Sequence, residues 1–171
     1  MKRSLQAVLL LMLLAVNFGA TAQSFEVPKD YHFKNKGDYS KYEPDIIKLA
    51  DWMQQTPWTA QKAKCDAAGQ FLLAWIQGTP DVVIELTQSV MNLSDVNPQL
   101  GFTFIAQFSK YTLQHKGAFN KKQANMEALR AVIAKYNAEP THKKDDDVET
   151  LISMEKEGRL EDWVNNDFHY N

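Results

Sequence analysis

Apolar residues recur three and four positions apart over most of this chain, which is the spacing of one face of an α-helix. The clearest case is the segment 45–55, which follows Pro44. Proline lacks the N–H that the first turn of a helix leaves unpaired, so Pro44 predicts a helix start. The apolar stripe of this helix consists of Ile46, Leu49, Ala50 and Met53.

Thr56 and Pro57 repeat the same start pattern and predict a second helix over 58–77. Gly78 is expected to end it in the left-handed conformation that glycine adopts freely. The apolar face of this helix consists of Cys65, Ala68, Leu72 and Trp75. Because the only cysteine falls on that face, we expect a buried, unpaired thiol with a raised pKa and low reactivity.

The rest of the chain carries further helix patterns, of which the segment 81–91 is the least clear. Val82, Val83 and Ile84 are β-branched and suit a short strand as well as a helix, and we predict a helix. Caps, prolines and glycines bound the other elements. They are a helix from Asn97-Pro98 to Gly117, one from Asn120 to Pro140, one from Asp145 or Asp146 to Gly158, and a last turn or two at Leu160, Trp163 and Val164.

Five to six helices joined by short linkers are most easily packed as antiparallel neighbours. The sequence therefore predicts an all-α fold, either a compact bundle or a stack of helical hairpins, with a single α-helical domain over 43–171. The helix faces do not recur at a fixed period of about 34 or 40 residues, so a repeat array is the second choice.

Residues 23–42 lack helical periodicity and combine five aromatic residues with several lysines. Gly37-Asp38 is typical of a turn, so we predict an irregular aromatic arm. Five aromatic side chains left in water would create a binding or aggregation surface, so they must cover either the helices or a partner. We favour the structural cover. The only candidate binding residues are Tyr31, Phe33, Tyr39 and Tyr42.

The first 22 residues have the three parts of a secretory signal peptide. Lys2 and Arg3 are basic, the largely apolar run 5–16 follows, and the small residues of 20–22 provide a cleavage site after Ala22. The run is shorter than the ~20 residues that a membrane-spanning helix needs. We therefore expect an exported protein, periplasmic or secreted, whose mature chain begins at Gln23 and has no transmembrane segment.

The charge of the chain argues against nucleic-acid binding, which depends on a basic surface. The formal net charge is −2. Its distribution is uneven, because residues 109–144 contain eight basic and two acidic side chains, whereas 145–171 contain two and nine. We expect helices from the two blocks to lie side by side and neutralise each other.

No residue pattern in the sequence predicts a metal, cofactor or catalytic site. The four histidines lie in separate segments and lack the spacing of known metal or haem motifs. The acidic run at 145–147 fails as a calcium loop, since position six is Thr150 and position twelve is Lys156. The same acids at a helix N-terminus stabilise the helix dipole.

These observations favour a small exported, non-enzymatic interaction or accessory module. Its partner would be another envelope or secreted protein, or a peptide. The alternative is a periplasmic or secreted hydrolase whose site assembles from dispersed acids and His115 or His142. A pocket that gathers titratable groups with perturbed pKa values would favour the enzyme, and an apolar groove would favour binding.

Overall fold

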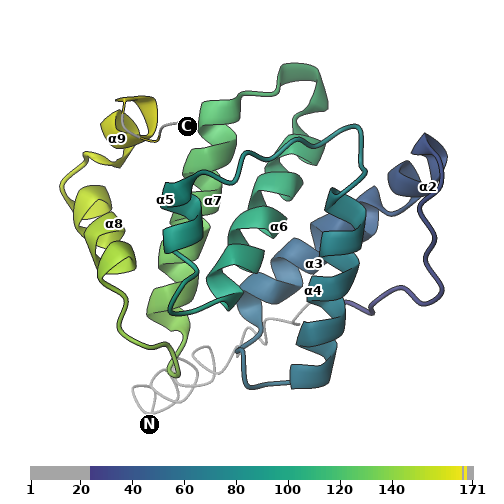
Figure 1. Cartoon of the computed structure of the whole chain (residues 1–171), viewed down its shortest axis with the longest axis horizontal. Coiled ribbons are helices and arrows are strands. Elements are labelled where there is room, and N and C mark those ends of the chain that lie inside the picture. Colours follow the sequence, from purple (N-terminus) through teal and green to yellow (C-terminus); the bar gives the residue numbers. More distant parts are fainter. Residues whose placement is uncertain (1–23, 167, 169–171) are drawn as a thin grey trace, which may run out of the picture.

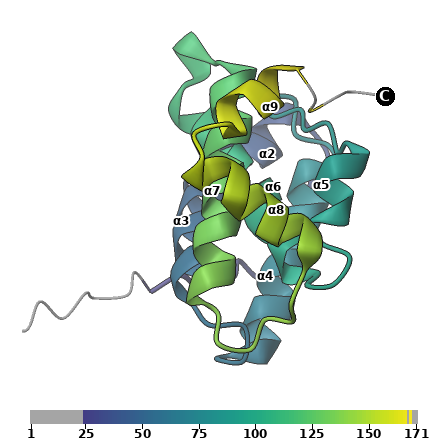
Figure 2. The same ribbon diagram turned by 90° about the vertical axis from the view of Figure 1, so that its left-hand side faces the viewer.

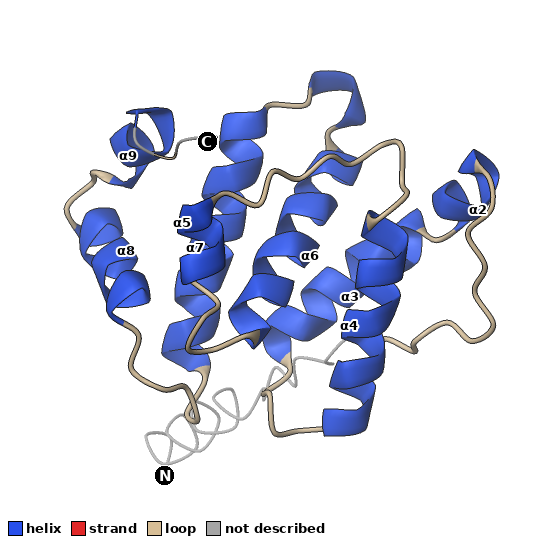
Figure 3. Ribbon diagram, viewed as in Figure 1, coloured by secondary structure: helices blue, strands red, loops and turns tan. Residues whose placement is uncertain are grey.

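The structure is a computed structural model that describes residues 24–166 and residue 168. Regular structure in this part of the chain is entirely helical, which confirms the predicted all-α class (Figure 3). The 3-10 turn η1 (Lys116–Ala118) follows α6. The eight α-helices of the described part are α2 (Lys36–Lys41), α3 (Glu43–Gln55), α4 (Lys62–Ile76), α5 (Gln88–Asn92), α6 (Gln99–Gln114), α7 (Lys121–Ala138), α8 (Asp146–Lys156) and α9 (Leu160–Asn166).

Helix α6 lies at the centre of the molecule and packs against α3, α4, α5 and α7 (Figure 1). Its buried side chains include Leu100, Phe104 and Phe108, which have almost no exposed surface. Helices α6 and α7 form an antiparallel hairpin joined through η1, and α8 and α9 pack against α7 (Figure 2). The described part of the chain has more helices than the predicted five to six, and α2 lies in a segment that was predicted to be irregular.

Several helix ends lie where the sequence predicts them. Pro44 stands in the first turn of α3. Asn120 caps α7 by accepting a 3.1 Å hydrogen bond from the Gln123 N–H, and Asp145 caps α8 in the same way. Gly158 follows α8 with a φ of +70°, the left-handed conformation expected there.

The predictions for α4 and for 81–91 need correction. Helix α4 begins at Lys62, because residues 58–61 form turns and Gln61 is left-handed at a φ of 55°. Of the segment 81–91, only the part from Gln88 is helical, where the Thr87 side chain accepts a hydrogen bond from the Val90 N–H. The β-branched residues before it belong to neither a helix nor a strand.

The aromatic arm is irregular only as far as Asn35, which corrects the predicted span 23–42. Asn35 and Asp38 form a reciprocal capping box that starts α2, so Gly37-Asp38 is the first turn of a helix. The Lys34 and Asn35 N–H groups donate hydrogen bonds to the Asp38 carboxylate. The bond from Lys34 is the main reason why the pKa of Asp38 lies below its usual value.

The arm packs on α4, as the structural-cover hypothesis predicts. Phe71 of α4 is fully buried, and the rings of Tyr31 and Tyr42 contact it at centroid distances of 5.0 and 5.6 Å. Phe33 stacks on Tyr39 at 4.8 Å. The four candidate binding residues are half-buried by these contacts.

Gly78 is required by a close approach and not by its backbone conformation, since its φ is negative. A Cβ atom at this position would overlap the Tyr39 hydroxyl and lie 2.7 Å from the ring carbon that bears it. We expect Gly78→Ala to lower the free energy of unfolding by about 1–3 kcal/mol, as overpacking does. Chemical denaturation measures this change. Gly117→Ala is the matched control because its Cβ would meet no atom within 4 Å, and equal effects of the two would contradict the prediction.

Helices of the basic and acidic blocks lie side by side as expected, but only part of the basic block pairs with the acidic one, since Lys110, Lys116 and Lys121 pair with acids before residue 109. Lys122 of α7 contacts Glu161 of α9 at 2.7 Å, and Arg130 of α7 contacts Glu155 of α8 at 2.9 Å. Exposed ion pairs contribute little to stability individually. They offset the repulsion that each block would otherwise carry. Among the described residues, no helix has both the length and the apolar character that a bilayer crossing requires.

Candidate functional site

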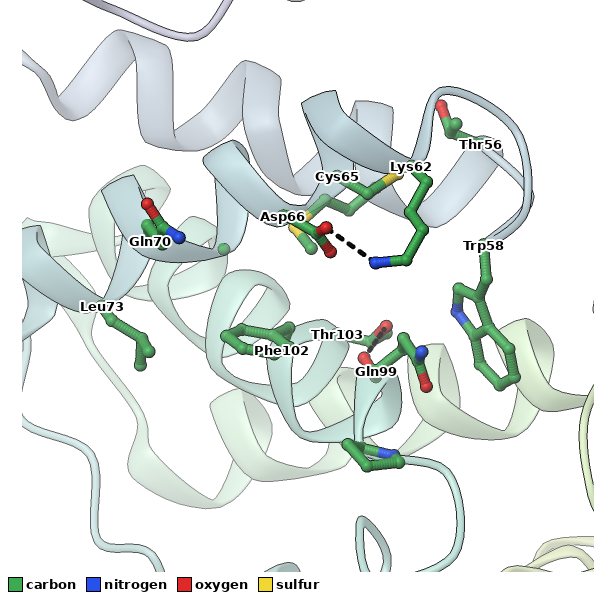
Figure 4. Close-up of a pocket in the computed structure, with 13 residues that line it drawn as sticks. Thr56, Trp58, Lys62, Cys65, Asp66, Gln70, Leu73, Gln99, Phe102 and Thr103 are labelled. Carbon is green, nitrogen blue, oxygen red and sulfur yellow. Dashed lines mark hydrogen bonds and ion pairs between the residues drawn. The ribbon is translucent and has the colours of Figure 1, made fainter.

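The main concave site is a groove between α4 and the first half of α6, with a volume of about 390 Å³ (Figure 4). We call it the α4–α6 groove. The loop after α3 closes one end through Trp58, and Leu73 lies at the opposite end. The side chains and backbone that line it belong to Met53, Thr56, Trp58, Lys62, Cys65, Asp66, Gly69, Gln70, Leu73, Pro98, Gln99, Phe102 and Thr103.

The floor of the groove depends on a close contact between α4 and α6. Phe102 of α6 lies beside Gly69 of α4, where a Cβ atom would stand 3.2 Å from the ring. Glycine at this position therefore allows the ring to lie against the α4 backbone. Phe102 and Met53 are only partly buried, so apolar surface remains open to the groove.

Polar groups lie along the rim of the groove. Lys62 and Asp66 form an ion pair of 2.7 Å one helical turn apart on α4, and both side chains are exposed. The Thr103 hydroxyl donates to the Gln99 carbonyl within α6, at 3.2 Å. The Gln99 side chain itself is exposed at the groove mouth. An apolar floor with a few polar groups at its edge is typical of a ligand site.

A second hollow, also of about 390 Å³, adjoins the groove and shares Trp58, Lys62, Pro98 and Gln99 with it. Its other wall comes from the loops on either side of the α6–α7 hairpin. The Asn97 side-chain amide donates to the Lys143 carbonyl and its oxygen accepts from the Lys143 N–H, both at 2.8 Å. This two-point contact fixes the positions of both loops.

A buried ion pair on α7 holds the loop that closes the groove. Lys135 Nζ lies 3.5 Å from the Glu139 carboxylate, and both side chains are almost completely buried. Lys135 Nζ also donates to the Thr56 carbonyl at 2.6 Å, and the Trp58 N–H donates to Glu139 at 2.9 Å. Burial lowers the pKa of Lys135. Through these two hydrogen bonds to the backbone of the loop, the ion pair holds Trp58 in position.

Sequence reasoning missed this pair. A lysine and a glutamate four residues apart on a helix are usually exposed, and nothing in the local pattern distinguishes this pair from an exposed one. The one available indication was that Glu139 stands at the end of its helix, next to Pro140. There a side chain can turn away from the helix surface toward a neighbouring loop.

Cys65 is half-buried in the groove wall, which corrects the expectation of a thiol fully inside the core. Its Sγ donates to the Ala60 carbonyl at 3.4 Å, and burial raises the pKa of the thiol. The raised pKa agrees with the expectation of low reactivity. Helix α4 begins four residues later than predicted, so Cys65 lies in its first turn, where it lines the groove together with Trp58.

The other predicted candidates lie outside the groove. None of Tyr31, Phe33, Tyr39 and Tyr42 lines it, and their role in binding stays a prediction. His115 Nδ1 donates to the Tyr111 carbonyl at 2.8 Å, and His142 Nδ1 donates to the Glu139 carbonyl at 2.6 Å. Neither histidine lines the groove. His169 and the predicted signal peptide lie outside the described residues.

Within the described ranges, no group of three or more His, Cys, Asp or Glu side chains is arranged to hold a metal ion. The α4–α6 groove has an apolar floor, with the Lys62–Asp66 ion pair at its rim. Comparison of the chain with protein-family models, with curated proteins and with solved structures found no match.

Proposed function

We propose that this protein is an exported, non-enzymatic helical binding module, and that a ligand or partner inserts an apolar group into the α4–α6 groove. The observation that carries the proposal is the groove itself. It is concave, its volume of about 390 Å³ is that of a ligand site, and Phe102 and Met53 leave apolar surface open in it.

The wall structure supports a preformed site. Trp58 is tied to Glu139, and Lys143 is tied to the Asn97 amide. A site whose loops are already ordered loses less conformational entropy when a ligand binds. The groove therefore requires no folding step to accept an apolar group.

The chemistry of the groove favours binding over hydrolysis. In the described part of the chain the groove lining contains no histidine, and burial raises the pKa of the Cys65 thiol. A raised pKa disfavours the thiolate, which is the nucleophilic form. The groove therefore resembles the apolar groove expected of a binding protein more than the pocket of titratable groups with perturbed pKa values expected of an enzyme.

The groove is tested with N-phenyl-1-naphthylamine, an uncharged apolar probe whose fluorescence rises in apolar surroundings. We expect the protein to bind it, and we expect Gln99→Trp to weaken binding at least tenfold by filling the groove mouth. The matched control is Gln114→Trp, because Gln114 is exposed at the other end of the same helix and outside the groove. Failure of the protein to bind the probe, or equal weakening by both substitutions, would contradict the proposal.

Cys65 gives an independent measurement of occupancy. We expect a thiol reagent to label the native protein more slowly than the denatured chain, because burial both raises the thiol pKa and limits access. Saturating probe should slow labelling further. A labelling rate that the probe leaves unchanged would place the probe elsewhere on the molecule.

The export part of the proposal rests on the sequence of residues 1–22. Mass spectrometry of the protein purified from the envelope or the medium should find Gln23 as the first residue. An intact Met1 on exported protein would refute the assignment of a cleaved signal peptide.

A further inference from the structure

We propose that the ligand is a small amphipathic organic anion. Its apolar body lies in the α4–α6 groove and its anionic group lies in the adjoining hollow, between Lys62 and Lys143. This inference rests on the proposed function and adds the charge and the size class of the ligand.

The adjoining hollow carries cationic side chains. In the described part of the chain, its lining includes two lysines and no carboxylate. Lys143 has no ion-pair partner among the described residues, whereas Lys62 contacts Asp66 on the groove side. The Lys62 side chain is 77% exposed, so its ammonium group can reach either hollow. An anion placed there would be attracted by the ammonium group of Lys143 and could compete with Asp66 for that of Lys62.

The α4–α6 groove and the adjoining hollow are continuous. The two hollows share Trp58 and Lys62 on one side and Pro98 and Gln99 on the other. A ligand that follows this path passes from the apolar floor at Phe102 to Lys62 and Trp58 (Figure 4). From there it enters the adjoining hollow, which Lys143 also lines. An apolar surface followed by a cationic one matches a ligand with an apolar body and an anionic end.

The volumes of the two hollows suit a small occupant. Each hollow has a volume of about 390 Å³, within the range of small-molecule sites. Protein partners instead bind over broad surfaces of roughly 800 Å² on each side. A concave site with separate apolar and cationic parts therefore favours a small molecule over a protein surface.

The test compares two probes with a similar aromatic body. The compound 8-anilino-1-naphthalenesulfonate carries an anionic sulfonate, and N-phenyl-1-naphthylamine lacks it. Affinities are measured by fluorescence titration for the full mature chain, Lys62→Gln, Lys143→Gln and the control Lys144→Gln. Lys144 is adjacent in sequence, 78% exposed and paired with Asp146, but it does not line either hollow.

We expect Lys62→Gln and Lys143→Gln each to weaken binding of the anionic probe about two- to fivefold, as loss of one exposed charge contact does. Binding of the uncharged probe should be the same in all variants. Lys144→Gln should bind the anionic probe as tightly as the unmodified protein does. Added salt should weaken binding of the anionic probe more than binding of the uncharged probe. Circular dichroism melts verify that all variants fold.

The results distinguish a failure of the proposed function from a failure of the anion inference. If the uncharged probe does not bind, the proposed function is wrong. If it binds and Gln99→Trp blocks it, but the anionic probe shows no loss in Lys62→Gln and Lys143→Gln, only the anion inference is overturned. An equal loss in Lys144→Gln overturns it as well. Two competitors are also compared, dodecanoate and an acetylated peptide that ends in a phenylalanine carboxylate. If the peptide displaces the anionic probe at lower concentrations than dodecanoate does, the inference of a small amphipathic anion is overturned.

Discussion

Glu139→Ala is expected to lower the free energy of unfolding by about 3–5 kcal/mol, because it leaves Lys135 buried without its counter-charge. The Glu139 side chain also accepts hydrogen bonds from the Trp58 N–H and the Thr141 hydroxyl, at 2.9 and 3.1 Å. Its removal leaves the Trp58 N–H without this acceptor. We therefore also expect weaker binding of apolar probes, since Trp58 closes the α4–α6 groove.

Chemical denaturation of a small set of variants measures this effect. Glu127→Ala is the matched control, since Glu127 is an exposed glutamate on α7, and its free energy of unfolding should change by less than about 0.5 kcal/mol. The double variant Lys135→Met with Glu139→Ala should be less destabilised than the sum of the two single variants, because no unpaired charge stays buried. A loss below about 1 kcal/mol for Glu139→Ala would mean that the pair is accessible to water.

Leu72→Ala should lower the free energy of unfolding by about 2–5 kcal/mol, the range for large apolar side chains truncated in a core. Leu72 has no exposed surface and lies on the buried face of α4 with Phe71 and Trp75. The loss combines the missing apolar burial with the cavity that the neighbours cannot fill.

Leu73→Ala provides the comparison at the next position in the sequence. Leu73 is 37% exposed and lies at the end of the α4–α6 groove, so its truncation should cost clearly less stability. The two substitutions remove the same atoms, and denaturation midpoints report the difference directly. Similar losses for both would contradict the assigned orientation of α4.

The sequence determined the helical class and most helix ends because both depend on local interactions. Apolar spacing depends on 3.6 residues per turn, and Asn120, Asp145 and Gly158 act on groups within four residues of themselves. The capping box of Asn35 and Asp38 was equally local. It was overlooked because the aromatic spacing of the arm showed no helical period.

The late start of α4 and the glycine after its end have a physical reason in tertiary contacts. Trp58 is held by Glu139, a residue 81 positions away, and this contact keeps residues 58–61 out of the predicted helix. Gly78 follows α4 because Tyr39 occupies the space beside it. No local pattern carries information about either neighbour.

The α4–α6 groove was decided by tertiary structure alone. The sequence placed Cys65 correctly on the same helix face as Leu72, but it could not show that this face opens to a groove at its first turn. Phe102 and Gly69 come from helices whose approach depends on the whole core. A helix stripe fixes which side chains turn inward, whereas the spaces between helices depend on side-chain volumes and on the angles at which the helices pack.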